Sequence, residues 1–212
     1  MKMMKVRGRI YTPDRYGNGA VYGEKLIDIE GITFREWVPW RSKLGALLKR
    51  TELPFALHGN ILYLGAAQGT TVSHISDVLE DGTIYAVEFS RVPFSKLMRL
   101  AGSRKNVVPI LADAFHPERY RAQAPSVDIL YQDVSQKDQL GLFMKNADMF
   151  LENGGHGIIM VKARSIDVTA RPEKIYDVFR KGLEENGLEV LNVIDLGPFQ
   201  KDHAAVLLKR VR

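Results

Sequence analysis

Three acidic residues and one lysine each stand at the end of a short apolar stretch. Glu88, Asp113 and Asp133 follow three such stretches, and Lys162 ends a fourth. Taken singly, each would be read as a helix cap or a surface charge. If the stretches are parallel strands, however, their carboxyl ends meet at the edge of the sheet where open α/β folds bind ligands. Carboxylates and an amine gathered there can bind hydroxyl groups, balance a cation and move a proton.

The segment Ile61–Glu88 indicates what kind of ligand this edge binds. It reads as a buried strand, the turn GAAQG, a helix capped by Thr70 or Thr71, and a second strand that ends in Glu88. Glu88 lies nineteen residues after the last glycine of the turn, where such folds place an acid that holds ribose hydroxyls. The segment is typical of a site for a nucleoside-containing cofactor.

The middle of the turn distinguishes between two cofactor classes. A dinucleotide-binding turn has the pattern G-x-G-x-x-G, because its middle glycine lets the pyrophosphate approach the backbone. Gly65 opens the turn here, but Ala67 occupies the middle position and adds a methyl group. An alanine tolerates a ligand without a diphosphate, such as S-adenosylmethionine. The turn therefore favours a methyltransferase over an NAD-type oxidoreductase, with a structural turn that binds nothing as the remaining possibility.

The polar residues at the strand ends suit methyl transfer. A methyl sulfonium is a cation, so carboxylates compensate its charge while Glu88 binds ribose hydroxyls. Asp113 can accept a hydrogen bond from an adenine amino group, and Phe89 can lie against the ring. If the acceptor is a hydroxyl group, Lys162 is the candidate to remove its proton, and we expect Asp133 to orient this lysine.

Length and composition predict one α/β domain with a small appendage. The chain has 212 residues, of which 45% are hydrophobic, and it contains no cysteine. No apolar stretch is long enough to cross a bilayer, and none follows the basic start as in a signal peptide. We therefore expect a cytoplasmic protein without disulfides. The five histidines show no metal-ligand spacing, so no metal site is predicted.

The net charge of +5 lies in the first quarter of the chain. Residues 1–50 contain eleven Lys and Arg against five Asp and Glu, whereas residues 51–212 contain nineteen against twenty. This quarter is where a polyanion should dock, although a solvated basic face explains the excess equally well. Trp37 and Trp40 leave a similar choice. They can stack on RNA bases, but we favour a hydrophobic clamp between two parts of the protein, because large aromatic side chains are usually buried.

The elements that must position these residues follow from the periodicity of the chain. Strands at 6–11, 25–29 and 32–37 predict a small antiparallel unit, and a helix then runs from a Ser42 cap to Pro54. Seven further strands are expected at 61–65, 83–88, 107–111, 127–131, 156–162, 188–194 and 204–209. Helices are expected at 71–80, 91–102, 137–152 and 172–186, the third of them stopped by Asn153-Gly154-Gly155.

Alternation of strands and helices predicts a mostly parallel sheet covered on both faces. The segment 197–199 is too short for a crossover helix, so the last two strands should be antiparallel. The predicted architecture is α/β, a Rossmann-like seven-stranded methyltransferase sheet with a small N-terminal antiparallel β unit. We expect the small unit and its leading helix to occupy residues 1–53 and the methyltransferase domain residues 54–212.

Several motifs together resemble fibrillarin, in its compact archaeal form. They are VYGEKL at 21–26, FREWVPWRSKL at 34–44, YLGAAQGTT at 63–71, YAVEF at 85–89, Asp113-Ala114, YQDVSQ at 131–136 and VKAR at 161–164. These motifs cover almost the whole chain and agree with the family in order and spacing. One departure lies in the turn, where Gln68 replaces the small serine that is usual in the family, and we expect it to alter cofactor affinity.

The resemblance implies an S-adenosylmethionine-dependent 2′-O-methyltransferase for ribose in rRNA and tRNA. It also implies a ribonucleoprotein with a box C/D guide RNA, a Nop-type scaffold protein and a kink-turn-binding ribosomal-type protein. A non-catalytic subunit of such a complex is the alternative. Besides Gly65, the cofactor contacts implied are Thr70, Thr71, Glu88, Phe89, Asp113, Ala114, Asp133, Val134, Ser135 and Gln136. The implied catalytic residues match a Lys-Asp-Lys-Glu tetrad at Lys43, Asp133 and Lys162, with His203 nearest to the fourth position.

Overall fold

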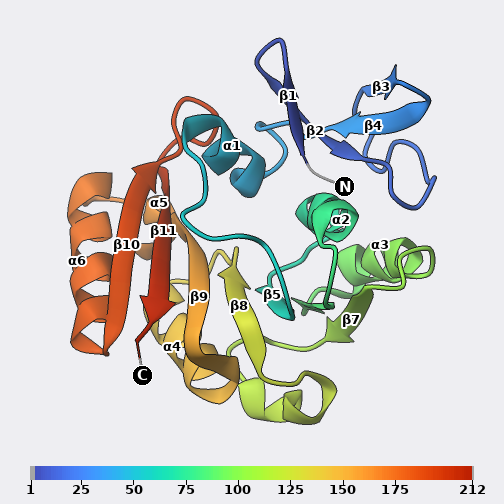
Figure 1. The fold of residues 1–212 in the computed structure, drawn as a ribbon. Coiled ribbons are helices and arrows are strands. Elements are labelled where there is room, and N and C mark those ends of the chain that lie inside the picture. The colour runs from blue at the N-terminus through green and yellow to red at the C-terminus, as the bar shows by residue number, and fades with distance from the viewer. Residues whose placement is uncertain (1–2, 212) are drawn as a thin grey trace.

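The computed structural model describes residues 3–211, which form two β-sheets (Figure 1). The smaller sheet is antiparallel and contains, in spatial order, β1 (Met4–Val6), β2 (Arg9–Pro13), β4 (Ile32–Glu36) and β3 (Leu26–Ile29). The small antiparallel unit is thus confirmed, but the single strand expected over 6–11 is wrong. Arg7 and Gly8 both have positive φ, 47° and 74°, and turn the chain into a hairpin between β1 and β2.

The larger sheet confirms the seven-stranded prediction. Its spatial order is β10 (Leu188–Asp195), β11 (His203–Arg210), β9 (Leu151–Lys162), β8 (Val127–Gln132), β5 (Ile61–Leu64), β6 (Ile84–Glu88) and β7 (Val107–Leu111). The five strands from β9 to β7 are parallel, and β11 runs antiparallel to both of its neighbours. The last strand of the chain therefore lies inside the sheet, between β9 and β10.

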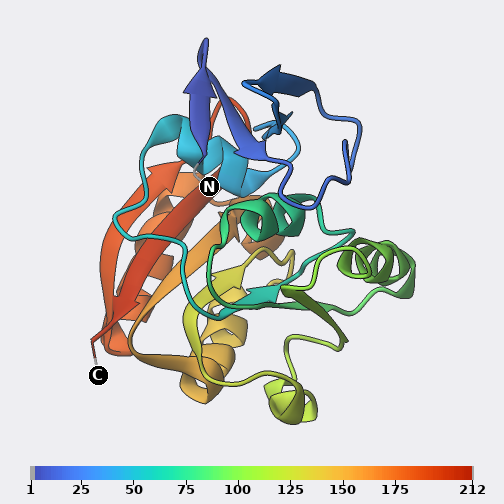
Figure 2. The same cartoon turned by 45° about the vertical axis from the view of Figure 1, so that its right-hand side comes forward.

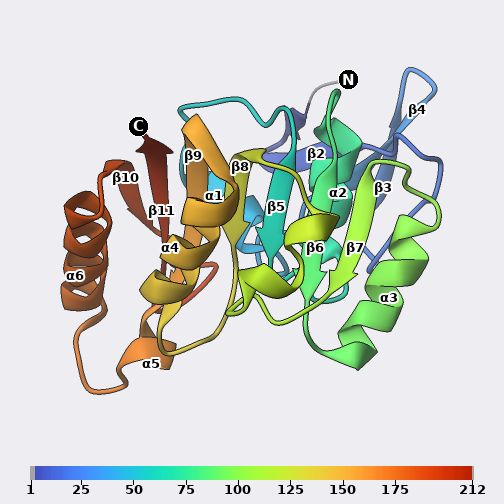
Figure 3. The same cartoon turned by 90° about the horizontal axis from the view of Figure 1, so that it is seen from below.

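Helices cover both faces of this sheet (Figure 3). They are α1 (Lys43–Arg50), α2 (Thr70–Val78), α3 (Arg91–Ala101), α4 (Gln139–Phe150), α5 (Ala163–Ile166) and α6 (Pro172–Glu185), with single 3-10 turns at Pro117–Arg119 and Arg121–Gln123. Apolar residues of α4 and α6 pack on one face, and those of α1, α2 and α3 pack on the other. No helix in residues 3–211 is long and apolar enough to span a bilayer.

Three helix boundaries differ from the prediction. Gly69, with φ 90°, is the residue before α2 and makes no side-chain cap, so neither Thr70 nor Thr71 caps this helix. Ser42 does cap α1, but α1 ends at Arg50 because Thr51 is already extended, well before Pro54.

The third boundary is the end of α4. Asn153-Gly154-Gly155 does not stop this helix, because α4 ends at Phe150 and these residues lie within β9. Their extra length is absorbed where the pairing of β8 with β9 shifts register between Val127 and Ile129. Glycine suits such an irregularity, since Gly154 has φ 80°.

A buried ionic network fastens the small sheet to the large one. Arg35 on β4 donates to Glu24 Oε1 at 2.7 Å and to Asp77 Oδ2 at 2.5 Å. Asp77 on α2 also accepts from Arg104 Nη1 at 2.5 Å. All four side chains are 0% exposed, and their two positive and two negative charges balance. The small sheet lies next to α1 and α2 (Figure 1 and Figure 2).

Trp37 forms a second, aromatic connection between the sheets. It is fully buried, donates from Nε1 to Ser42 Oγ at 2.9 Å, and stacks on His74 of α2 at 4.7 Å. This confirms the clamp for Trp37. The clamp is wrong for Trp40, which is 59% exposed. Its ring contacts that of Phe199 edge to face, with 5.1 Å between the ring centres. Trp37 belongs to one apolar cluster with residues of the large sheet. The division of the chain between residues 53 and 54 stays a prediction.

His74 is expected to make the protein less stable as the pH falls below about 6.5. Its ring nitrogens share hydrogen bonds with Thr12 Oγ1 at 2.7 Å and the Tyr22 hydroxyl at 2.8 Å. Burial lowers the pKa of His74 well below its ordinary value, and the nearby charges of Arg35 and Arg104 lower it further. On acidification the unfolded chain binds a proton that the folded chain does not, so stability rises with pH by at most about 1.4 kcal/mol per unit from this residue.

The measurement is urea denaturation of the protein and of His74→Gln at pH values of about 5, 6 and 7. The variant should lose less stability between pH 7 and 5 than the parent does, whatever its stability at pH 7. Identical slopes for the two proteins would contradict the assignment to His74.

Candidate active site

The strand order of the large sheet reverses between β5 and β8, and the turn after β5 passes directly against the end of β8. The amides of Gly65 and Ala66 both donate to Val87 O at 3.0 Å, and Asp133 N donates to Leu64 O at 2.9 Å. Gly65 has φ 82°, and a Cβ there would lie 2.4 Å from Asp133 O. The turn therefore needs glycine at this position, where α/β sheets bind their ligands.

Glu88 is held rigidly beside the turn. Its Oε2 accepts from Ala67 N at 2.8 Å and its Oε1 from Ser90 N at 2.7 Å, and the residue is only 7% exposed. Each carboxylate oxygen keeps a lone pair that can accept from a further donor, which suits the two hydroxyls of a ribose. Phe89 follows with an exposed ring, and Asp113 stands at the end of the neighbouring strand β7.

A cavity of about 310 Å³ opens beside this turn. Predicted cofactor residues among those that line it are Gly65, Thr70, Thr71 and Asp133. The other predicted contacts lie along the same edge of the sheet. Glu88 ends β6 and Phe89 follows it, Asp113 and Ala114 come after β7, and Val134, Ser135 and Gln136 come after β8. The start of α2 suits a carboxylate, Glu88 suits a ribose, and Asp133 suits a sulfonium charge, so the residues present fit S-adenosylmethionine.

Asp133 is paired with Lys43 and not, as expected, with Lys162. Lys43 Nζ donates to Asp133 Oδ1 at 2.5 Å, and the two side chains are 21% and 16% exposed. The partner differs because α1 begins over this edge of the sheet, held there by a 2.9 Å hydrogen bond between Ser42 Oγ and Thr71 Oγ1. Lys162 Nζ instead contacts Ser135 Oγ at 3.3 Å.

His203 lies close to Lys162 because β11 runs antiparallel to β9. As the first residue of β11, it pairs in register with Lys162, the last residue of β9. Burial lowers the pKa of His203, and the charges of Lys43 and Lys162 also lower it, while Asp133 and the bond to Lys201 O act in the opposite direction. Nδ1 lies 2.6 Å from Lys201 O, so a neutral ring donates there and keeps Nε2 free to accept a proton.

The structure thus brings the four predicted catalytic residues to one edge of the sheet, beside the cavity. Their individual roles stay predictions. Sequence reasoning missed Gln139, a buried residue at the start of α4. Its Nε2 donates to Lys162 O and its Oε1 accepts from Lys162 N, both at 3.1 Å. One side chain therefore binds both the N–H and the C=O of the Lys162 backbone. A glutamine in the first turn of a helix is ordinary, and nothing in the sequence marks it.

Comparison with known proteins agrees with this geometry. The model of the fibrillarin family matches residues 1–212. The chain belongs to the fibrillarin family. A relative from Methanosarcina barkeri, named fibrillarin-like rRNA/tRNA 2′-O-methyltransferase, is 43% identical over 212 residues, which is 98% of this chain and 94% of the relative.

Two crystal structures of fibrillarins share the whole fold. One, described as a fibrillarin/Nop5p complex, is similar with a TM-score of 0.89 and 42% identity, over 98% of this chain and 97% of the matched chain. The other is Aeropyrum pernix fibrillarin in complex with natively bound S-adenosyl-L-methionine, with a TM-score of 0.87 and 38% identity over 98% of both chains. The resemblance to fibrillarin that the motifs carry is therefore confirmed.

Proposed function

We propose that this fibrillarin-family protein transfers the methyl group of S-adenosylmethionine to the 2′-hydroxyl of ribose in rRNA and tRNA. The observation that carries the proposal is the Lys43–Asp133 ion pair at 2.5 Å on the rim of the cofactor cavity, with Lys162 and His203 on adjoining strand ends. A fibrillarin with bound S-adenosylmethionine and a relative named for rRNA and tRNA 2′-O-methylation support it.

The chain's own residues have distinct tasks in this reaction. When bound, the cofactor supplies a methyl group on a positively charged sulfur. Glu88 would bind the cofactor's ribose, and Thr70 and Thr71 at the start of α2 would bind its carboxylate. Lys43, fixed by Asp133, stands where it can stabilise negative charge that develops on the acceptor oxygen. In place of Lys162, the candidate named from the sequence, we assign removal of the hydroxyl proton to His203, whose lowered pKa keeps the ring neutral and whose Nε2 is free to accept.

We further propose that a box C/D guide RNA selects the target ribose within a ribonucleoprotein. The solved fibrillarin/Nop5p complex supports a Nop-type scaffold protein as a partner. The guide RNA and a kink-turn-binding ribosomal-type protein are proposed from the family resemblance alone. Base pairing would then choose the site, because residues that contact only the RNA backbone cannot read its sequence.

The test is methylation by the assembled complex. The protein is combined with guide RNA, scaffold protein, kink-turn-binding protein, target RNA and S-adenosylmethionine labelled on the methyl group. Label should enter one ribose, opposite a fixed position of the guide. Calorimetry with S-adenosylmethionine and with NAD is run in parallel. Binding of NAD alone would indicate an oxidoreductase, and cofactor binding without transfer in the complete complex would indicate a non-catalytic subunit.

Gln139→Leu is expected to slow methyl transfer about ten- to a hundredfold. The substitution removes the hydrogen bonds that Gln139 makes to the backbone N–H and C=O of Lys162, and Lys162 then loses its fixed position beside Ser135 and His203. The rate is measured in a single turnover with the assembled complex, and cofactor affinity by calorimetry should stay unchanged. Gln123→Leu, which replaces an exposed glutamine, is the control. An equal loss of rate in both variants would contradict a positioning role for Gln139.

A further inference from the structure

A second cavity of about 460 Å³ lies between the loop that joins β2 to β3, the cofactor turn and α3. We call it the basic groove. Its cationic lining residues are Arg41, Lys96 and Arg99, and none of the described residues that line it is acidic. It is continuous with the cofactor cavity, because Arg41, Gln68, Thr70 and Lys96 line both. Arg99 lines only the groove, and Asp133 lines only the cofactor cavity.

The cations of the groove are not neutralised by acids of this chain. Within residues 3–211, none of the three forms an ion pair, whereas Arg35, Arg104 and Arg164 each have a carboxylate partner. Neutral groups contact two of them, Arg41 and Lys96. The Arg41 guanidinium lies 5.8 Å from the centre of the Tyr22 ring, and Lys96 Nζ donates to Gln68 Oε1 at 3.4 Å. The groove is therefore an exposed, uncompensated positive surface that suits an anion.

We propose that the basic groove binds the sugar–phosphate backbone of the RNA strand that carries the acceptor ribose. This inference rests on the proposed function. A ribose within a strand is joined to a phosphate on each side, so its 2′-hydroxyl reaches Asp133 only if those phosphates are accommodated close by. The groove adjoins the cavity that Asp133 lines, and it supplies the guanidinium and ammonium groups that bind phosphate best. Contacts of this kind position the strand without reading its bases.

Arg99 separates this role from binding of the cofactor. Arg41 and Lys96 line both cavities, so either can also attract the carboxylate of S-adenosylmethionine. Arg99 reaches only the groove. A change at Arg99 should therefore act on RNA and leave the cofactor unaffected. Gln68, the residue of the cofactor turn that departs from the family, lines both cavities and accepts a hydrogen bond from Lys96.

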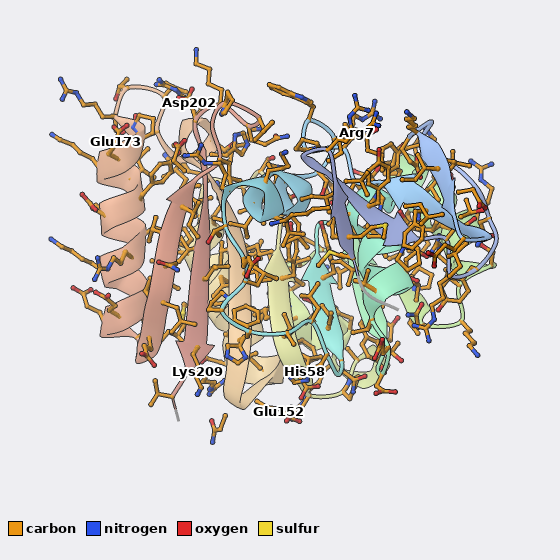
Figure 4. All side chains as sticks on the ribbon, turned by 45° about the horizontal axis from the view of Figure 1, so that its top comes forward. Arg7, His58, Glu152, Glu173, Asp202 and Lys209 are labelled. Carbon is orange, nitrogen blue, oxygen red and sulfur yellow. The ribbon has the colours of Figure 1, made fainter. Side chains whose placement is uncertain are left out.

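The experiment compares Arg99→Ala, Arg99→Lys and the control Lys209→Ala. Lys209 lies at the end of the sheet opposite to Asp202, which precedes His203 (Figure 4). Affinity for a fluorescent single-stranded RNA is measured by anisotropy at several salt concentrations. Arg99→Ala should weaken binding roughly three- to tenfold at low salt and reduce the slope of log K against log salt by about 0.7. Arg99→Lys keeps the positive charge, so its RNA affinity and salt slope should stay close to the parental values. Lys209→Ala should change neither quantity.

Two further measurements test which ligand the groove binds. In the assembled complex, Arg99→Ala should raise the KM for target RNA, and calorimetry should give unchanged affinity for S-adenosylmethionine. The inference is overturned if RNA affinity and salt slope stay at parental values, if cofactor affinity falls instead, or if only affinity for the scaffold protein falls. Failure of the unchanged protein to methylate would contradict the proposed function, whereas the anisotropy series tests the groove separately.

Discussion

Asp133→Asn is expected to slow methyl transfer about a hundred- to a thousandfold, the range for loss of one group that stabilises developing charge. Within the described residues, Asp133 is the only ion-pair partner of Lys43, with 2.5 Å between Lys43 Nζ and Asp133 Oδ1. Asp133 also lines the cofactor cavity. An amide of the same shape removes the charge that fixes Lys43 and that balances a sulfonium. Because both side chains of the pair are partly exposed, stability should change little.

The measurement is a single-turnover rate in the assembled complex, with cofactor affinity from calorimetry and the melting temperature from a thermal scan. Asp148→Asn, an exposed acid on α4, is the matched control and should retain the parental rate. If Asp133→Asn methylates its target within threefold of the parent, Asp133 has no direct part in the reaction.

Asp77→Asn is expected to lower the free energy of unfolding by about 3–5 kcal/mol. Asp77 is the shared partner of Arg35 and Arg104, and all three side chains are 0% exposed. The variant leaves one buried positive charge uncompensated, which is the costly way to break a buried ion pair. Since typical domains are stable by only about 5–15 kcal/mol, this loss is a large fraction of the total.

Urea denaturation measures this loss, because urea does not screen charges as a guanidinium salt does. Glu184→Gln is the control, since it breaks the exposed Arg180–Glu184 pair on α6, where at most about 1 kcal/mol is expected. Similar losses in the two variants would mean that the buried network does not fasten the small sheet to α2.

The sheet, and most of the polar residues at the ends of its strands, could be predicted from the sequence because the patterns that indicate them are local. The turn after β5, the acid at the end of β6 and the short link before β11 are each contained within a few residues. The Arg7-Gly8 hairpin was missed because arginine is unusual at positive φ and gives no turn signal. The place of Trp40 was also missed, since apolar size alone does not tell a buried ring from an exposed one.

Which residues of the site contact one another was harder to predict than which residues belong to it. Asp133 was expected to orient Lys162, yet it meets Lys43, which is ninety residues away in the chain. Which lysine reaches the carboxylate depends on where α1 crosses the edge of the sheet, and no local pattern encodes that. The same holds for Gln139, whose contact with the backbone of Lys162 exists only once α4 has packed beside β9.

The place of β11 in the sheet has a consequence for synthesis of the protein on the ribosome. Residues 203–210 lie between β9 and β10, so a growing chain that lacks them leaves the apolar stretch Ile158–Val161 of β9 without a neighbour on that side. Such an edge can pair with other chains and aggregate. The residues that close it begin with His203, so protection of the nascent sheet and completion of the catalytic edge occur in one step. A chain that ends before β11 should therefore be both inactive and prone to aggregate.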